Sequence, residues 1–144
     1  MIVLDASAAI AMALGSEYGR ALEGQLLEGE TVLAPALLFS EVTHELVKYV
    51  RAGCLGQEEA VACGRDAVGL VDRFCDDGEL WVEAMGESVR LGHSSYDLFY
   101  VVLARRTGAT LFTLDKKLQD LSLSLGVNSV WLTKLEGKRG PAAS

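Results

Sequence analysis

Short apolar runs that are rich in β-branched residues alternate with helix-like stretches along this sequence, and no other feature constrains its fold as strongly. We expect buried strands in five runs: 1–4, 31–34, 80–82, 110–113 and 129–132. We expect helices in the stretches between them: 6–14, 17–27, 35–53, 57–75, 83–91, 96–107 and 116–125. Strands that alternate with helices form a parallel sheet covered on both faces, with right-handed crossovers. The sequence therefore predicts an α/β fold, a three-layer α/β/α sandwich with a parallel sheet.

Proline and glycine mark the ends of several of these elements. Pro35 should stop the second strand and suits the first turn of the helix that follows. That helix should end near Gly53 in a left-handed cap. Its apolar side chains recur at near-helical spacing: Leu38, Val42, Leu46 and Tyr49. One face of this helix should therefore pack on the core.

The length of 144 residues and a hydrophobic content of 50% fit one domain with one core. We expect that domain over residues 1–133 and a polar tail over 134–144.

The three cysteines, Cys54, Cys63 and Cys75, form no C-x-x-C pair, which favours free thiols and a reducing cytoplasm. No charge-free apolar stretch reaches the ~18 to 20 residues of a membrane span, and Asp5 interrupts the apolar start, which argues against a signal peptide.

The charge balance narrows the possible functions. Thirteen Lys and Arg stand against 20 Asp and Glu, a net charge of -7. This balance lacks the broad basic surface of a protein that holds nucleic acid only through phosphate contacts. It argues less against an enzyme whose acidic residues bind divalent cations, because those cations offset the negative charge.

Four carboxylates are predicted to meet at one edge of the sheet: Asp5, Glu41, Asp97 and Asp115. Asp5 and Asp115 follow predicted strands, where parallel α/β sheets place their ligand crevice. Glu41 and Asp97 lie in helices that leave or approach the same edge. At ~4 Å, two like charges repel by about 4 kcal/mol at an effective dielectric near 20, and a divalent cation reverses that sign. The pattern therefore predicts a site for Mg²⁺ or Mn²⁺.

Such a site suits hydrolysis of phosphodiester bonds. Mg²⁺ keeps several waters when carboxylates bind it, which leaves positions for a substrate phosphate. A bound ion lowers the pKa of a water and stabilises the charge that develops during the reaction. We therefore expect a nuclease that uses metal-activated water and forms no covalent intermediate.

At these residues the chain resembles the PIN-domain ribonucleases, and within them the toxins of VapBC-type toxin-antitoxin modules. The matching stretches are IVLDASA (2–8), SEVTHEL (40–46), SSYDLFYVVLARRTGATLFTLDKKL (94–118) and GVNSVWL (126–132). The resemblance implies that the four acids form the metal site, with the Ser7 and Thr113 hydroxyls beside them. It also implies a homodimer, RNA as the substrate and a small antitoxin protein as a partner. The segment 53–92 carries no matching motif.

Each acid also has a simpler structural interpretation. Ser94 and Asp97 fit a capping box, Asp5 and Asp115 fit helix caps, and Glu41 fits a solvated flank. One shared site explains all four more economically than four coincidences. We expect Glu45 on a solvated face and expect no zinc, since His44 and His93 lack cysteine partners at zinc spacing.

Several basic residues flank the motifs and are candidates for phosphate contacts, although most surface basic residues only solvate a face. They are Lys48, Arg51, Arg105, Arg106, Lys116 and Lys117.

Three alternative functions remain open. A receiver-type phosphoacceptor normally has a paired acid after the first strand, but Ala6 follows Asp5; Lys134 after the last strand keeps this alternative open. A haloacid-dehalogenase-type phosphatase would need an acid where Ser7 stands. A catalytically silent interaction module with the same fold is the third.

Overall fold

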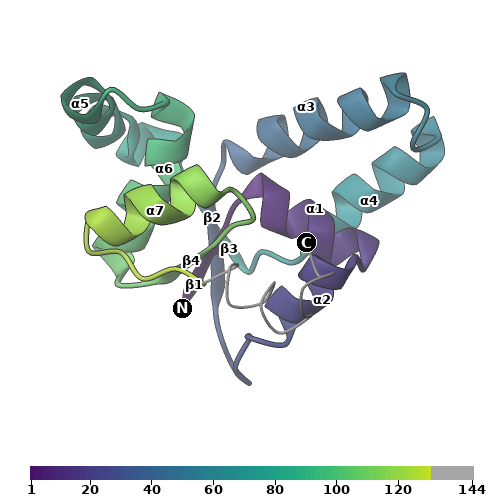
Figure 1. The fold of residues 1–144 in the computed structure, drawn as a ribbon, viewed down its shortest axis with the longest axis horizontal. Coiled ribbons are helices and arrows are strands. Elements are labelled where there is room, and N and C mark those ends of the chain that lie inside the picture. The colour runs from purple at the N-terminus through teal and green to yellow at the C-terminus, as the bar shows by residue number, and fades with distance from the viewer. Residues whose placement is uncertain (131–144) are drawn as a thin grey trace, which may run out of the picture.

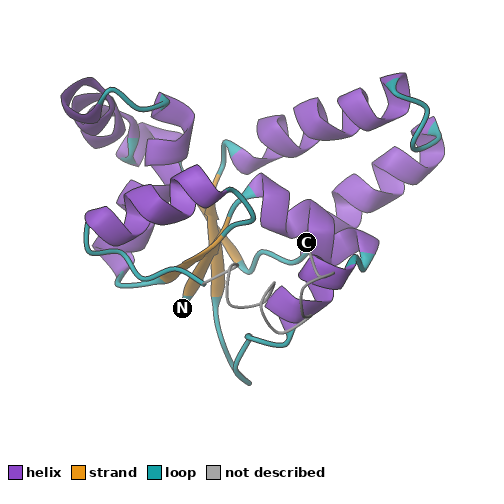
Figure 2. Ribbon diagram, in the orientation of Figure 1, coloured by secondary structure: helices purple, strands orange, loops and turns teal. Residues whose placement is uncertain are grey.

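The computed structural model describes residues 1–130 and shows a parallel sheet between two layers of helices (Figures 1 and 2). Its strands are β1 (Ile2–Leu4), β2 (Val32–Pro35), β3 (Arg73–Cys75) and β4 (Thr110–Phe112). Their order in the sheet is β3-β2-β1-β4, and every pairing is parallel. The predicted α/β class is confirmed.

The helices are α1 (Ala6–Leu14), α2 (Glu17–Glu23), α3 (Leu38–Arg51), α4 (Gln57–Gly69), α5 (Trp81–Leu91), α6 (Ser95–Thr107) and α7 (Lys116–Ser124). A short 3₁₀ turn, Asp77–Glu79, precedes α5. In Figure 1, α1 to α4 lie on one side of the sheet and α5 to α7 on the other. This arrangement is the predicted three-layer sandwich.

The register of the central strands determines which residues meet at the edge of the sheet. All three residues of β1 are buried, as expected for a central strand covered on both faces. Leu4 of β1 pairs with Phe112 of β4, and the Asp5 amide donates to the Phe112 carbonyl at 3.2 Å. Asp5 and Thr113 therefore leave the sheet side by side.

One hydrophobic core fills both layers, as the length and composition predict. Helix α6 contributes most to the layer on its side, since Leu98 and every residue from 100 to 104 are buried. The stripe on α3 is confirmed, with Leu38, Val42 and Leu46 buried. Helices α1 and α2 approach closely at Gly19, where an added Cβ would lie 2.0 Å from the Ala11 carbonyl oxygen.

The expected strand at 80–82 and the single helix over 57–75 are wrong. Helix α4 ends at Gly69, and the chain then forms the edge strand β3. Two hydrogen bonds between Asp72 and Val32 place β3 beside β2. The Val32 amide donates to the Asp72 carboxylate, and the Asp72 amide donates to the Val32 carbonyl, each at 2.8 Å. Leu80 is buried, but Trp81 and Val82 begin α5 and are exposed. The apolar triplet is therefore a helix start, while β3 is too exposed to show a strand pattern.

Other predicted boundaries need smaller corrections. Helix α2 ends at Glu23, before the predicted 27. Pro35 is the last residue of β2 instead of part of the α3 first turn. The expected last strand begins as a parallel bridge between Ser129 and Leu111. Its remainder, the predicted tail and Lys134 lie outside the described residues.

The cysteines and the helix lengths agree with the sequence analysis. Cys54, Cys63 and Cys75 are free, as predicted. Among residues 1–130, no helix combines the length and apolar character needed to cross a bilayer. The cytoplasmic location stays a prediction.

Candidate functional site

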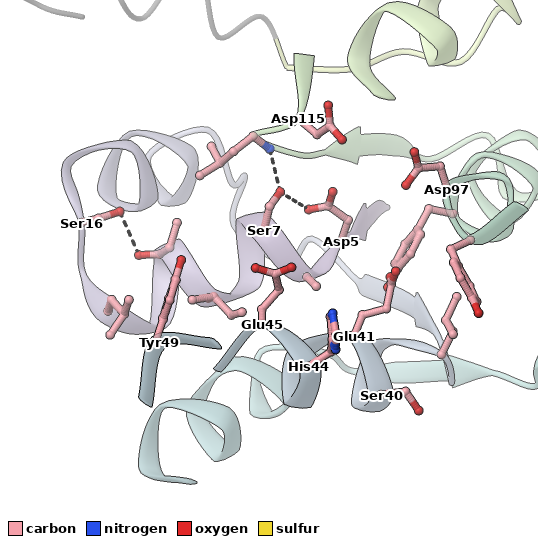
Figure 3. Close-up of a pocket in the computed structure, with 18 residues that line it drawn as sticks. Asp5, Ser7, Ser16, Ser40, Glu41, His44, Glu45, Tyr49, Asp97 and Asp115 are labelled. Atoms are coloured by element: carbon pink, nitrogen blue, oxygen red, sulfur yellow. Dashed lines mark hydrogen bonds between the residues drawn. The ribbon is translucent and has the colours of Figure 1, made fainter. Parts of the chain in front are cut away.

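A cavity of about 880 Å³ opens at the sheet edge where the strands end (Figure 3). All four predicted acids line it, and Glu45 is a fifth. Within residues 1–130, no Lys or Arg lines this cavity. The fold therefore collects carboxylates from the ends of β1 and β4 and from α3 and α6. His44 also lines the cavity, and two of the acids contact a side chain outside the lining, Glu45 with Lys48 and Asp97 with His93.

Asp5 is the most buried of these acids, with 6% of its surface exposed. It caps α1, because its Oδ1 accepts from the Ala8 amide at 2.9 Å. Burial raises its pKa to about 6, against the lowering effect of hydrogen bonds from Thr113, Ala8 and Ser7. Glu41 adds a smaller repulsion that also raises this pKa. The carboxylate is thus fixed in position at a cost that a nearby cation would reduce.

Two hydroxyls hold the Asp5 carboxylate and join the end of β1 to the end of β4. Ser7 Oγ donates to Asp5 Oδ1 at 2.7 Å and accepts from the Leu114 amide at 3.0 Å. The Thr113 hydroxyl donates to Asp5 Oδ2 and accepts from the Asp115 amide at 3.0 Å. Both hydroxyls therefore orient Asp5 directly. Their contact with a metal or its waters stays a prediction.

Glu41 lies in the first turn of α3, half-buried beside Tyr100 of α6. Burial raises its pKa, the Tyr100 hydroxyl lowers it, and the Asp97 and Glu45 charges raise it further. Among the described residues, the buried Tyr100 hydroxyl has no hydrogen-bond partner of normal geometry. Burial and the Glu41 charge raise the Tyr100 pKa, so this phenol stays neutral and offers a donor to the pocket.

Asp97 points from α6 toward the space beside Asp5 and Asp115 (Figure 3). Ser94 makes no side-chain capping bond, which removes one half of the capping box that the sequence allowed. Asp97 Oδ2 instead lies 2.9 Å from His93 Nε2. Asp97 therefore faces the pocket and contacts a histidine whose role the sequence analysis missed.

Asp115 caps α7, as its structural interpretation predicts. Its Oδ1 accepts from the amides of Lys117 at 2.9 Å and Leu118 at 3.5 Å. Asp115 also lines the pocket, so capping and a functional role are compatible, as they are at Asp5.

The sequence analysis missed several pocket residues, His44 among them, and a contact of His93, which lies outside the lining, with Asp97. Glu45, expected on a solvated face, has a side chain that is 38% exposed, and it also lines the cavity with Tyr49 and Glu41. Spacings of four residues put these three on one face of α3. His93 stands four residues before Asp97, a spacing that signals a contact at a helix start. Within residues 1–130, no three Asp, Glu, His or Cys residues form a ready-made metal cage, so the acids surround a shared space.

Two of the basic candidates are already paired elsewhere. Arg105 contacts Glu83 at 2.6 Å and Glu87 at 2.7 Å, and Arg106 contacts Glu83 at 3.0 Å. These pairs join α5 to α6 outside the cavity. Arg105 and Arg106 therefore stabilise the packing of two helices, and the structure gives no support for their predicted phosphate contact.

Comparison with known families gives a match over most of the chain. The PIN domain family matches residues 2–122. VapC ribonuclease Mb0985 of Mycobacterium bovis is 32% identical over 134 residues, which cover 83% of this chain and 90% of that protein. Ribonuclease VapC3 of Pyrobaculum aerophilum is 27% identical over 121 residues, which cover 83% of this chain and 92% of the relative.

Solved structures show the same fold. PAE2754 from Pyrobaculum aerophilum aligns with a TM-score of 0.70 at 24% identity, over 90% of this chain and 83% of that chain. VapC20 of Mycobacterium tuberculosis, described as a Sarcin-Ricin loop cleaving toxin, aligns with a TM-score of 0.63 at 18% identity. That alignment covers 84% of this chain and 95% of VapC20.

Proposed function

This chain belongs to the PIN domain family, among its VapC-type members, and on that premise we propose that it is a Mg²⁺- or Mn²⁺-dependent endoribonuclease. The observation that carries the proposal is the pocket itself, where Asp5, Glu41, Asp97 and Asp115 meet and where no Lys or Arg is among the lining residues of the described range 1–130. The names of its relatives as ribonucleases support RNA as the substrate.

The donor set fits a hard divalent cation. Carboxylate oxygens suit Mg²⁺ and Mn²⁺, whereas zinc sites usually use Cys or His. Burial is the main cause that raises the pKa values of Asp5 and Glu41, and neighbouring acids raise them further, so a bound cation would favour both ionised carboxylates. Mg²⁺ is commonly held by one or two carboxylates and several waters, so acids around a shared space suit it without a closed cage.

The chain's own residues would position the reacting groups. A bound ion would supply activation of water and stabilisation of phosphate charge. Ser7 and Thr113 keep both Asp5 oxygens in fixed directions, while Glu41, Asp97 and Asp115 present carboxylates from other elements. The Ser7 hydroxyl is already engaged with Asp5 and Leu114. It is therefore a positioning group, and water is the proposed nucleophile.

A cleavage assay tests this function and separates it from its rivals. We expect purified protein to cut total RNA at defined positions with Mg²⁺ or Mn²⁺ and not with EDTA, and end sequencing would locate the cuts. Asp115→Asn should reduce cleavage strongly. The matched control Asp120→Asn, an exposed acid on α7, should not. Absence of cleavage with either metal would favour the receiver-type or silent interaction module.

The small antitoxin partner is a proposal from the VapC resemblance and the charge of the pocket. Carboxylates without a cation would attract a basic side chain, since charge-assisted hydrogen bonds are stronger than neutral ones. We expect a co-expressed antitoxin to place Arg or Lys near Asp5 and Asp97. A structure of the complex would check this, and a partner bound entirely outside the cavity would contradict it.

Self-association is also a proposal. Helix α5 exposes a group of large apolar side chains: Trp81, Val82, Met85 and Val89. Such a patch is typical of an interaction surface, and a symmetric homodimer would bury the same patch on both copies. Light scattering should give twice the chain mass at micromolar concentration. A monomer under those conditions would rule out the homodimer.

A further inference from the structure

The cavity extends past the acidic residues into an arm between α1 and α3. The α1 wall of this arm is apolar, with Ile10, Ala11 and Leu14, and Tyr49 projects from α3 toward it (Figure 3). Tyr49 is half-buried, packs partly against the core and lines the cavity with the rest of its surface. A metal and a phosphate group need neither an aromatic ring nor an apolar wall, so this arm is built for a different part of a ligand.

Glu45 lies between Tyr49 and the acids that surround Asp5 (Figure 3). Its carboxylate contacts Lys48 at 2.9 Å, and the Glu45 and Lys48 side chains are 38% and 55% exposed. Exposed pairs of this kind contribute little stability, so Glu45 can exchange this partner for a ligand. The arm therefore combines a stacking surface with a hydrogen-bond acceptor at its entrance.

We propose that this arm is a nucleobase subsite, in which Tyr49 stacks a base next to the cut and Glu45 accepts hydrogen bonds from its edge, with a preference for guanine. The proposal rests on the proposed function, because a ribonucleotide whose phosphate lies at the acids would direct a neighbouring base into the arm. Aromatic rings stack all bases, so the selectivity must come from Glu45.

The preference for guanine follows from the carboxylate chemistry. An ionised carboxylate has two acceptor oxygens and no donor. The Watson–Crick edge of guanine presents two adjacent donors, N1–H and the N2 amine, which match both oxygens. Adenine and cytosine offer one amine beside a ring-nitrogen acceptor, and uracil offers one N–H between two carbonyl oxygens. Each of the other three bases therefore faces the carboxylate with at least one repelling lone pair. The base must also be unpaired, as in a loop or single strand.

Short single-stranded RNAs that differ only at the bases next to one cut site test the subsite. At one flanking position, we expect wild-type kcat/KM to fall in the order guanine, inosine, adenine and abasic site. Loss of the base should cost roughly 5-fold or more, in line with base–aromatic stacking. Tyr49→Leu should lower cleavage of the guanine RNA to near that of the abasic RNA. Tyr18→Leu, a half-buried tyrosine on α2 outside the cavity, is the matched control and should keep the full preference.

Glu45→Gln separates base recognition from metal binding. We expect it to abolish the difference between guanine and adenine while the difference between guanine and the abasic site persists. If Glu45→Gln instead raises the Mg²⁺ concentration needed for every substrate and leaves the base preference unchanged, Glu45 belongs to the metal site. The assignment to guanine would then be wrong.

A binding measurement distinguishes failure of the subsite from failure of the proposed function. Fluorescence anisotropy with the Asp115→Asn variant and Mg²⁺ should give tighter binding of the guanine RNA than of the abasic RNA. Adding Tyr49→Leu should remove that difference. Equal affinities for both RNAs in the Asp115→Asn variant that keeps Tyr49 would overturn the subsite even if the wild type cleaves RNA. If the wild type cleaves no RNA, the nuclease proposal fails, and this difference in affinity alone decides whether the arm binds a base.

Discussion

Asp97→Ala should abolish metal-dependent RNA cleavage and leave the stability of the metal-free protein almost unchanged. When a residue that only hydrogen-bonds to a metal ligand is lost, metal affinity or activity commonly falls about 10- to 100-fold. Loss of a ligand itself should lower activity by more than that. If Asp97 were part of a capping box, the Asp97→Ala substitution would lower the stability by roughly 0.5 to 2 kcal/mol with or without metal. Ser94 makes no capping bond, so we do not expect that loss.

Two small effects of Asp97→Ala on the metal-free protein should nearly cancel. The contact with His93 disappears, but such partly exposed pairs contribute only about 0.2 to 1 kcal/mol. The repulsion between Asp97 and Glu41, which raises the pKa of Glu41, disappears as well. Chemical denaturation with and without Mg²⁺ would measure the free energy of unfolding of the metal-free and the metal-bound protein. Mg²⁺ should stabilise the wild type more than the variant. Equal stabilisation of both proteins, or retained cleavage by the variant, would remove Asp97 from the proposed site.

Asp5→Asn should make the metal-free protein more stable near neutral pH, although Asp5 is proposed as a metal ligand. The folded protein raises the pKa of Asp5 from 3.8 to about 6, mainly through burial. The folded state therefore holds this proton more tightly, and the stability it contributes is complete below about pH 3.8 and is lost as the pH rises through 6. The difference between the two pKa values corresponds to about 3 kcal/mol above pH 6.

Asparagine removes this titration while it keeps the local geometry. Its Oδ1 can still accept from Ala8 and Ser7, and its Nδ2 can donate to the Thr113 hydroxyl, which then accepts. Urea unfolding in EDTA from pH 4 to 8 should show a gain of up to about 3 kcal/mol that fades toward pH 4. Added Mg²⁺ should stabilise the wild type and have little effect on the variant. A variant less stable than wild type throughout this range would show that the hydrogen bonds to the ionised carboxylate outweigh its burial.

The sequence predicted those parts of the fold where local pattern and tertiary burial agree. Strands β1 and β4 are short apolar runs because each is covered on both faces, so their pattern is clear without a structure. Strand β3 is different, because Arg73 and Phe74 at the sheet edge are exposed. An exposed strand needs no apolar run, and the more apolar triplet at 80–82 was therefore mistaken for the strand.

The same distinction applies to the site. Asp5 and Asp115 were predictable because a parallel sheet places its strand ends at one edge. The residues Glu45 and Tyr49 were not, since their spacing defines a face of α3 but not the direction in which that face points. The contact between His93 and Asp97 spans the start of α6 and depends on where that helix begins. A helix pattern locates such a boundary only to within a few residues.

Because β1 and β4 are neighbours in the sheet but far apart in the sequence, the site can form only late in the synthesis of the chain. Asp5 is held by Thr113, 108 positions later in the chain, so a polypeptide still being synthesised cannot complete this site. At about 5 to 20 residues per second, the ribosome needs roughly 5 to 20 s to synthesise the stretch from Asp5 to Thr113. A chain that ends before β4 would contain Asp5 and Ser7 but would lack Thr113, whose hydroxyl donates to Asp5, and Leu114, whose amide donates to Ser7. Under the proposed function, a nascent chain would therefore lack a complete active site until residues 113–115 have been added.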